Sequence, residues 1–234
     1  MFAVILAGGK GSRLGSLTKS IPKPMVKIGG KPIIWHLLKI LNSNGINDFI
    51  ICLGYKGNVI KNYLKKQKND WNIQCLDTGQ DTLTAKRIFL VKDYIKSQKF
   101  LMTYGDGLAN INLKKLYNLH CKKKKIATVT AVSPIPRFGS LQIKKNNVIK
   151  FNEKIKDNKN LINGGFFILD KKIFKVINLN KNVMWEQEPM KILTKKKQLT
   201  AYFHESFWHP MDTERDQKYL NELSMKKKFP WKVW

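Results

Sequence analysis

Long apolar runs are missing from this sequence of 234 residues. The longest, residues 2–7 and 162–169, are far shorter than the about 20 residues that a membrane-spanning helix requires. No basic segment precedes the first run and no small-residue cleavage site follows it, so the sequence predicts no secretory signal. We therefore expect a soluble, cytoplasmic protein without a membrane partner.

Cysteine is also scarce. The three cysteines are far apart and form neither a CxxC pair nor a cluster with the four scattered histidines. An odd number without a metal-binding spacing predicts neither a disulfide framework nor a zinc site. We expect all seven side chains to pack in the core or to face solvent; they are Cys52, Cys75, Cys121, His36, His120, His204 and His209.

Acidic residues and arginine are few, whereas lysine is abundant. Lysine and arginine number 44 against 16 acidic residues, a net charge of +28, yet only four of the 44 are arginines. Such an excess of positive charge is typical of proteins that bind nucleic acid or an anionic membrane. Arginine, however, is the usual reader of bases and phosphates at specific sites. The sequence therefore favours no nucleic-acid partner, and an attraction for polyphosphate substrates instead.

Apolar segments of strand and helix character alternate along the chain. A continuous apolar run at 2–6 precedes a helical pattern over 32–41, and a second run at 48–53 precedes a helical pattern over 59–64. This alternation predicts right-handed βαβ units and a parallel sheet. Further strands are expected at 100–103, 127–133, 162–169 and 199–203, and further helices at 185–193 and 213–223.

No internal repeat or linker divides the chain. The polar stretch 144–160 is expected to be a hairpin or an excursion rather than a boundary. We therefore predict a single α/β domain, Rossmann-like, with a mostly parallel central sheet flanked by helices and with small insertions.

A glycine-rich loop follows the first predicted strand, in the segment LAGGKGSRL that runs from Leu6 to Leu14. Its glycines permit a backbone path in which successive N–H groups point at phosphate oxygens. Ligands of open parallel sheets bind at the carboxyl ends of the strands, where this loop stands. The segment fits neither the P-loop pattern nor GxGxxG. It predicts either a phosphate-binding loop of another kind or an ordinary turn between strand and helix.

Two further features support a site for phosphorylated ligands. Lys23 stands between Pro22 and Pro24, which restrict the backbone on either side. The segment Gly105-Asp106-Gly107 follows a predicted strand and offers a carboxylate that suits Mg²⁺. Each has a simpler alternative, since Lys23 is one lysine of 40 and aspartate is favoured in tight turns.

Together, the glycine-rich loop, its arginine and the Lys-Pro pair resemble the N-terminal fingerprint of the sugar-1-phosphate nucleotidyltransferases. Further segments look like one branch, the glucose-1-phosphate cytidylyltransferases, and follow that branch's order over essentially the whole chain. These segments are VKIGGKPIIWHLLKIL, GINDFIICLGYKGNVIKNY, TYGDG, RFGSL, INGGFFIL, WEQEP and HPMDTERD. WEQEP and the ending PWKVW are specific to the branch.

The resemblance implies transfer of CMP from CTP, with Mg²⁺, to the phosphate of glucose 1-phosphate, with release of pyrophosphate, for surface polysaccharide synthesis. It implies that residues 1–110 bind the nucleotide and residues 111–234 the acceptor. The implied catalytic residues are Arg13, Lys23 and Asp106. The nucleotide would be held by Leu6, Ala7, Gly8, Gly9, Gly11, Ser12, Arg13, Lys23 and Gly105, the Mg²⁺ by Asp106 and Asp212, and the acceptor by Lys154, Asn163, Gly164 and Glu188.

Three segments depart from the family pattern. EKP is Glu153-Lys154-Ile155 here, TGGR is Thr84-Ala85-Lys86-Arg87, and the segment before Leu76 is shorter. Because the added Cβ atoms at Ala85 and Lys86 would enter a backbone-lined pocket, they are expected to bear on the choice of base or acceptor. A sibling enzyme with another nucleotide or another phosphorylated acceptor therefore stays open.

Other classes of protein also stay open. A catalytically silent nucleotide-binding protein is disfavoured by the four retained charged residues, Arg13, Lys23, Asp106 and Asp212. A nucleic-acid-binding protein would need basic patches that are rich in arginine or interleaved with aromatic residues, and such patches are absent from the sequence. Asp212 would also serve as the N-cap of the helix predicted from residue 213. The aromatics Phe229, Trp231 and Trp234 predict either core closure or contact with a neighbour in a homo-oligomer.

Overall fold

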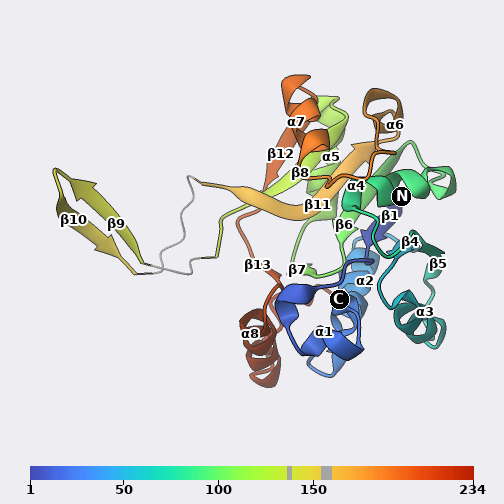
Figure 1. Ribbon diagram of the computed structural model, residues 1–234, viewed down its shortest axis with the longest axis horizontal. Coiled ribbons are helices and arrows are strands. Elements are labelled where there is room, and N and C mark those ends of the chain that lie inside the picture. The colour runs from blue at the N-terminus through green and yellow to red at the C-terminus, as the bar shows by residue number, and fades with distance from the viewer. Residues whose placement is uncertain (136–138, 154–159) are drawn as a thin grey trace.

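A seven-stranded sheet crosses the centre of the protein in the order β12-β8-β11-β6-β1-β4-β5 (Figure 1). The computed structural model describes residues 1–135, 139–153 and 160–234. Neighbouring strands are parallel except that β11 runs opposite to β6 and β8. The strands are β1 (Phe2–Leu6), β4 (Asp48–Leu53), β5 (Asn72–Asp77), β6 (Lys99–Tyr104), β8 (Ala127–Val132), β11 (Ile162–Asp170) and β12 (Leu199–Phe203).

Two apolar cores lie on opposite faces of this sheet. Side chains alternate along β1, so that Ala3 and Ile5 join the first core and Val4 and Leu6 the second. The first core is covered by α2 (Ile33–Ser43), α3 (Gly57–Lys65), α5 (Leu113–Lys123) and α8 (Glu214–Met225). The second is covered by α4 (Thr84–Leu90), α6 (Ile173–Val176) and α7 (Glu188–Lys195).

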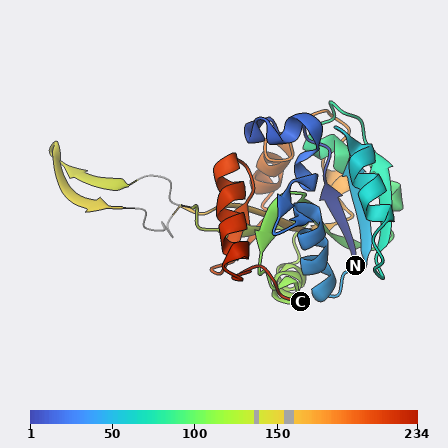
Figure 2. The same cartoon turned by 90° about the horizontal axis from the view of Figure 1, so that it is seen from below.

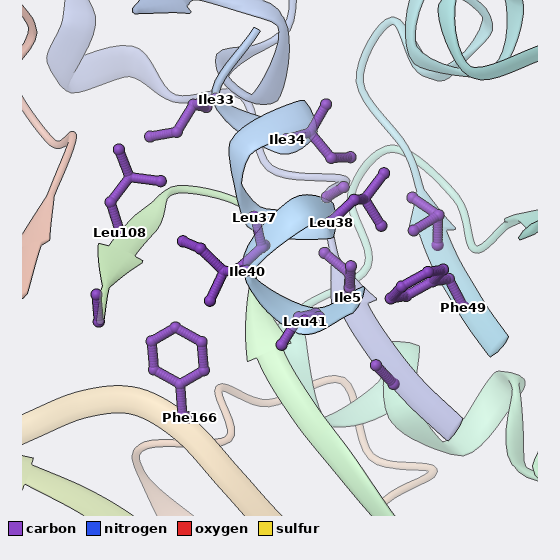
Figure 3. Packing of buried hydrophobic residues seen from close by; sticks show 14 of the residues in the cluster. Ile5, Ile33, Ile34, Leu37, Leu38, Ile40, Leu41, Phe49, Leu108 and Phe166 are labelled. Atoms are coloured by element: carbon purple, nitrogen blue, oxygen red, sulfur yellow. The ribbon is translucent and has the colours of Figure 1, made fainter. Parts of the chain in front are cut away.

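Helix α2 supplies much of the first core. Its apolar residues recur at helical spacing, and Figure 3 shows Leu38 and Leu41 on the side of the helix that faces Ile5 of β1 and Phe49 of β4. All four of these side chains are essentially without solvent exposure. Their burial anchors β1, and with it the loop that leaves its carboxyl end.

In the described part of the chain, three two-stranded ribbons stand outside the main sheet. The first pairs β2 (Lys27–Ile28) with β3 (Lys31–Pro32), and the second pairs β7 (Gly107–Ala109) with β13 (Trp208–Pro210). The third is a hairpin of β9 (Ser140–Lys144) and β10 (Asn147–Asn152), which projects away from the body (Figures 1 and 2). The stretch predicted as a hairpin or excursion therefore contains part of this hairpin.

The strands at 2–6, 48–53 and 199–203 have their predicted bounds. The predicted strand at 162–169 is present as β11, but it runs antiparallel to both of its neighbours. A parallel strand beside β8 would need a crossover connection, whereas the described part of the connection from β8 to β11 contains the β9–β10 hairpin. The helix predicted at 185–193 begins only at Glu188. β5, α4 and α5 were not predicted. None of the helices in the described ranges combines the length and apolar character needed to cross a bilayer.

The C-terminal aromatics close the first core of their own chain. Trp231 is fully buried, and its Nε1 donates a hydrogen bond to Nδ1 of His36 on α2, 3.3 Å away. His36 Nε2 in turn donates to the carbonyl oxygen of Ile28 at 2.9 Å. Trp234 lies against Trp35, with 5.8 Å between the ring centroids. Trp231 therefore closes the core, as one of the two alternatives predicted.

Two buried histidines make stability depend on pH. Burial lowers the pKa of His120 to about 4, with a further contribution from Lys99, and burial lowers that of His36 below 6.5. His120 therefore stays neutral in the folded state down to about pH 4, while the unfolded chain takes up protons on histidine below about pH 6.5. The stability that these histidines contribute is complete above pH 6.5 and is lost as the pH falls toward 4, by about 3 kcal/mol for His120.

Urea unfolding at pH 7.5, 6.0 and 4.5 measures this loss. His120 Nδ1 lies 2.9 Å from Thr128 Oγ1 in the core, so a His120→Gln variant keeps a polar partner for Thr128 but cannot titrate. We expect the variant to lose clearly less stability than the wild type between pH 7.5 and 4.5. Equal losses in the two proteins would contradict a role for His120.

Candidate active site

A cleft of about 560 Å³ opens at the carboxyl ends of β1 and β6. Its walls come from the glycine-rich loop after β1, the turn after β6, the start of β11 and the segment before α8. Most of the predicted site residues line it; these are Leu6, Ala7, Gly8, Gly9, Gly11, Arg13, Lys23, Gly105, Asp106, Asn163, Gly164 and Asp212.

Two of the predicted residues that the structure describes do not line the cleft. Ser12 lies in the loop but outside the cleft lining. Glu188 pairs with Lys181 at 3.0 Å, so the structure does not place it with the other predicted acceptor residues. Lys154 falls outside the described residues.

Lys23 joins the two predicted metal ligands in one cluster. Its Nζ donates to Asp106 Oδ2 and, at 2.7 Å, to Asp212 Oδ1. The Arg13 guanidinium makes a two-pronged contact with Asp212, at 3.0 and 3.1 Å. Burial alone would lower the pKa of Lys23, but the charges of Asp106 and Asp212 raise it above its ordinary 10.5. Lys23 is therefore a permanent cation, with a side chain only 10% exposed.

Local structure holds each member of this cluster in place. Lys23 begins a short 3-10 turn after Pro22, and Asp106 follows the end of β6. The N-cap of α8 is Thr213, which forms a capping box with Asp216, so the alternative of Asp212 as N-cap is wrong. Asp212 lies one residue earlier, and its side chain lines the cleft.

The donor set suits a magnesium ion that arrives with a phosphorylated ligand. Within the described ranges no group of three or more His, Cys, Asp or Glu side chains is placed to hold a metal. Asp106 and Asp212 are nevertheless within reach of the same Lys23 nitrogen. Mg²⁺ is commonly held by one or two carboxylates together with substrate phosphates and water. These two carboxylates therefore fit Mg²⁺.

Arg87 ties the glycine-rich loop to its neighbours, a role the sequence did not reveal. Its guanidinium is buried and donates hydrogen bonds to the carbonyl oxygens of Leu53 (2.9 Å), Gly8 (3.1 Å) and Gln80 (3.3 Å) and to Thr78 Oγ1. The clamp therefore engages oxygens from the carboxyl ends of β1, β4 and β5. No hydrogen bond to another described residue occupies the loop N–H groups of residues 8–10, which suit phosphate oxygens.

Gly8 and Gly9 provide a matched pair of test positions. A Cβ atom at Gly8 would lie 2.2–2.8 Å from atoms of the Arg87 guanidinium, whereas one at Gly9 would meet nothing within 4 Å. Because four acceptors hold the guanidinium, moving it aside would break hydrogen bonds. We expect Gly8→Ala to lower the free energy of unfolding by about 1–3 kcal/mol and Gly9→Ala by less than about 0.5 kcal/mol. Urea unfolding of the two variants checks this, and equal losses would contradict the clamp.

Other cleft residues also escaped prediction. Tyr104 and Glu186 line the cleft, and Trp208 Nε1 donates to the Gly164 carbonyl oxygen at 2.7 Å. Glu186 lies in the quoted motif WEQEP, two residues before the glutamate that the resemblance indicated. Ala85 is fully buried in the second core, and neither it nor Lys86 lines the cleft. Their added Cβ atoms therefore do not narrow it.

Comparison with known proteins agrees with this geometry. The family model described as "Nucleotidyl transferase" matches residues 2–221. The chain is 44% identical to glucose-1-phosphate cytidylyltransferase of Salmonella typhimurium and 43% identical to a probable glucose-1-phosphate cytidylyltransferase of Bacillus subtilis, over the full length of all three chains. The crystal structure of HddC from Yersinia pseudotuberculosis superposes with a TM-score of 0.75 at 27% identity, over 94% of this chain and 98% of that one. The protein therefore belongs to the nucleotidyltransferase family.

Proposed function

We propose that the protein transfers CMP from CTP to a sugar 1-phosphate, with glucose 1-phosphate as the expected acceptor. The products are pyrophosphate and a CDP-sugar, made in the cytoplasm for surface polysaccharide synthesis. The observation that carries the proposal is the buried Lys23 between Asp106 and Asp212, beside a loop whose N–H groups at residues 8–10 bond to no other described residue. Relatives named glucose-1-phosphate cytidylyltransferase, similar over the whole chain, support the choice of CTP and acceptor.

The chain's residues would act by positioning and by charge. The loop N–H groups from Gly8 onward hold the triphosphate, with Leu6 and Ala7 near the base. A phosphate oxygen of the acceptor attacks the α-phosphorus in line, and the bond to pyrophosphate breaks on the opposite side. Lys23 and Arg13 stabilise the negative charge that builds up on the α-phosphate oxygens. No covalent intermediate with the protein is needed.

Asp106 and Asp212 would hold Mg²⁺, which neutralises phosphate charge when it is bound. For this to happen, Lys23 and Arg13 give up their contacts with these carboxylates and turn to the phosphates. Nucleotide contacts would come mainly from residues 1–110 and acceptor contacts from residues 111–234. Asn163 and Gly164 lie in the cleft where the acceptor would bind; Lys154 would grip its phosphate, as the resemblance implies.

Pyrophosphate release tests the proposal directly. The protein is assayed with Mg²⁺ and glucose 1-phosphate, comparing CTP, UTP, dTTP, ATP and GTP. We expect release with CTP well above release with the other nucleotides. Preference for another nucleotide would overturn the choice of base. Binding of CTP without release would overturn the acceptor, and other phosphorylated compounds would then be compared.

A further inference from the structure

The cleft contains a carboxylate outside the cluster formed by Lys23 and its two aspartates. Glu186 lies just before α7, and two hydroxyl groups hold it: Tyr104 Oη donates to Oε1, and Thr84 Oγ1 donates to Oε2 at 3.2 Å. The backbone N–H of Trp185 donates to Thr84 Oγ1 at 2.7 Å, which leaves the hydroxyl proton for Glu186. Three segments that are distant in sequence therefore fix this side chain at the cleft wall.

The hydrogen bonds around Glu186 extend to an amide. Tyr104 Oη, which donates to Glu186 Oε1, is also within reach of Asn163. Asn163 Nδ2 donates a hydrogen bond to Tyr104 Oη at 3.4 Å. The carboxylate is thus connected to a residue already expected to contact the acceptor.

Glu186 forms no ion pair with any lysine, arginine or histidine in the described part of the chain, although the chain carries a net charge of +28. Lys23 and Arg13, in contrast, pair with Asp106 and Asp212 in the same cleft. Among the described residues, the cleft therefore offers cations for phosphate in one place and a carboxylate without a cationic partner in another.

Such a carboxylate distinguishes between chemical groups. Its two oxygens offer about four acceptor positions, of which the protein uses two, so sugar hydroxyl groups can donate to the remainder. A second phosphate or a carboxylate on the acceptor has no proton to donate at neutral pH and meets a like charge. For a partly exposed pair of charges at about 5 Å, this repulsion amounts to about tenfold in binding.

We propose, on the basis of the proposed function, that Glu186 sets the charge specificity of the acceptor subsite. Held by Tyr104 and Thr84, it accepts hydrogen bonds from the hydroxyl groups of a neutral sugar 1-phosphate. It rejects sugar 1-phosphates that carry a second anionic group. The acceptor is accordingly oriented with its phosphate toward Lys23 and its hydroxyl groups toward Glu186.

The test compares three acceptors that differ in charge: glucose 1-phosphate, glucuronic acid 1-phosphate and glucose 1,6-bisphosphate. The ratio of kcat/KM values with CTP is measured for the wild type, Glu186→Gln and Glu205→Gln. Glu205 is exposed and lies outside the cleft, so this control removes the same charge elsewhere. We expect the wild type to prefer glucose 1-phosphate by tenfold or more. Glu186→Gln should reduce that preference about tenfold, with the KM for CTP unchanged, and Glu205→Gln should leave the preference unaltered.

A Glu188→Gln variant decides between the two glutamates of the motif. If it shifts the preference and Glu186→Gln does not, the proposal is overturned. An equal loss with all three acceptors in Glu186→Gln would also overturn it, because a purely structural role would have that effect. If the wild type turns over none of the acceptors, the proposed function fails. Thermal stabilisation by the same three compounds then tests the charge preference independently, and an equal shift in wild type and Glu186→Gln would overturn it.

Discussion

Lys23→Ala is expected to lower the rate of pyrophosphate release by at least about a hundredfold, the loss typical when a preorganised electrostatic stabiliser is removed. The Lys23 side chain is 10% exposed, and its ammonium is held between Asp106 and Asp212 at the edge of the glycine-rich loop. A water molecule in its place would supply no fixed charge to the α-phosphate. The kcat with saturating CTP and glucose 1-phosphate measures the effect.

The same substitution has a second expected consequence. Without Lys23, the carboxylates of Asp106 and Asp212 keep only Arg13 as a described cationic partner. We therefore expect a modest loss of stability without Mg²⁺ and a smaller loss with it, while the fold survives. Lys27→Ala is the matched control, because this nearby lysine is exposed and lies outside the cleft. A kcat within a few-fold of wild type would show that the catalytic cation has been placed wrongly.

Asp106→Asn and Asp212→Asn are each expected to lower turnover by at least about a hundredfold at low millimolar Mg²⁺. The amide keeps the size of the side chain and can still accept a hydrogen bond from Lys23. It lacks the charge that makes an oxygen a good ligand for Mg²⁺. Turnover measured across a range of Mg²⁺ concentrations checks the reason for the loss. We expect half-maximal rate to move to higher concentration in both variants.

Asp93→Asn provides the comparison for this experiment, since Asp93 is an exposed carboxylate outside the cleft. It should show wild-type turnover and an unchanged Mg²⁺ dependence. If Asp106→Asn or Asp212→Asn lost activity without any change in Mg²⁺ dependence, the role of these carboxylates would be to position Lys23 and not to bind the metal.

The sheet was predictable where strands are continuous apolar runs. β1 and β4 are buried on both faces, so each appears in the sequence as an unbroken apolar segment. β5 lies half-buried at the edge of the sheet, and its segment Asn72–Asp77 mixes polar with apolar residues. The direction of β11 was not predictable from its own residues, because direction depends on the connection that precedes it.

The site was predictable where local chain geometry determines it. The glycine-rich loop and the prolines around Lys23 constrain the backbone within a few residues. Arg87 could not be found in this way, because its four acceptors come from three separate segments that only the folded sheet brings together. The choice between Glu186 and Glu188 depended on where α7 begins, and Pro189 in its first turn places Glu186 outside the helix.

The burial of Trp231 against α2 has a consequence for how the chain folds. His36 and Trp231 are 195 residues apart in sequence, yet they share a hydrogen bond in the first core. During synthesis, α2 and β1 are complete long before the residue that seals their core has been added. Contacts between such distant segments form slowly, because a large loop must close before they can stabilise anything. We therefore expect the first core of the nascent protein to remain incompletely packed until Trp231 has emerged, and nucleotide binding to appear only then.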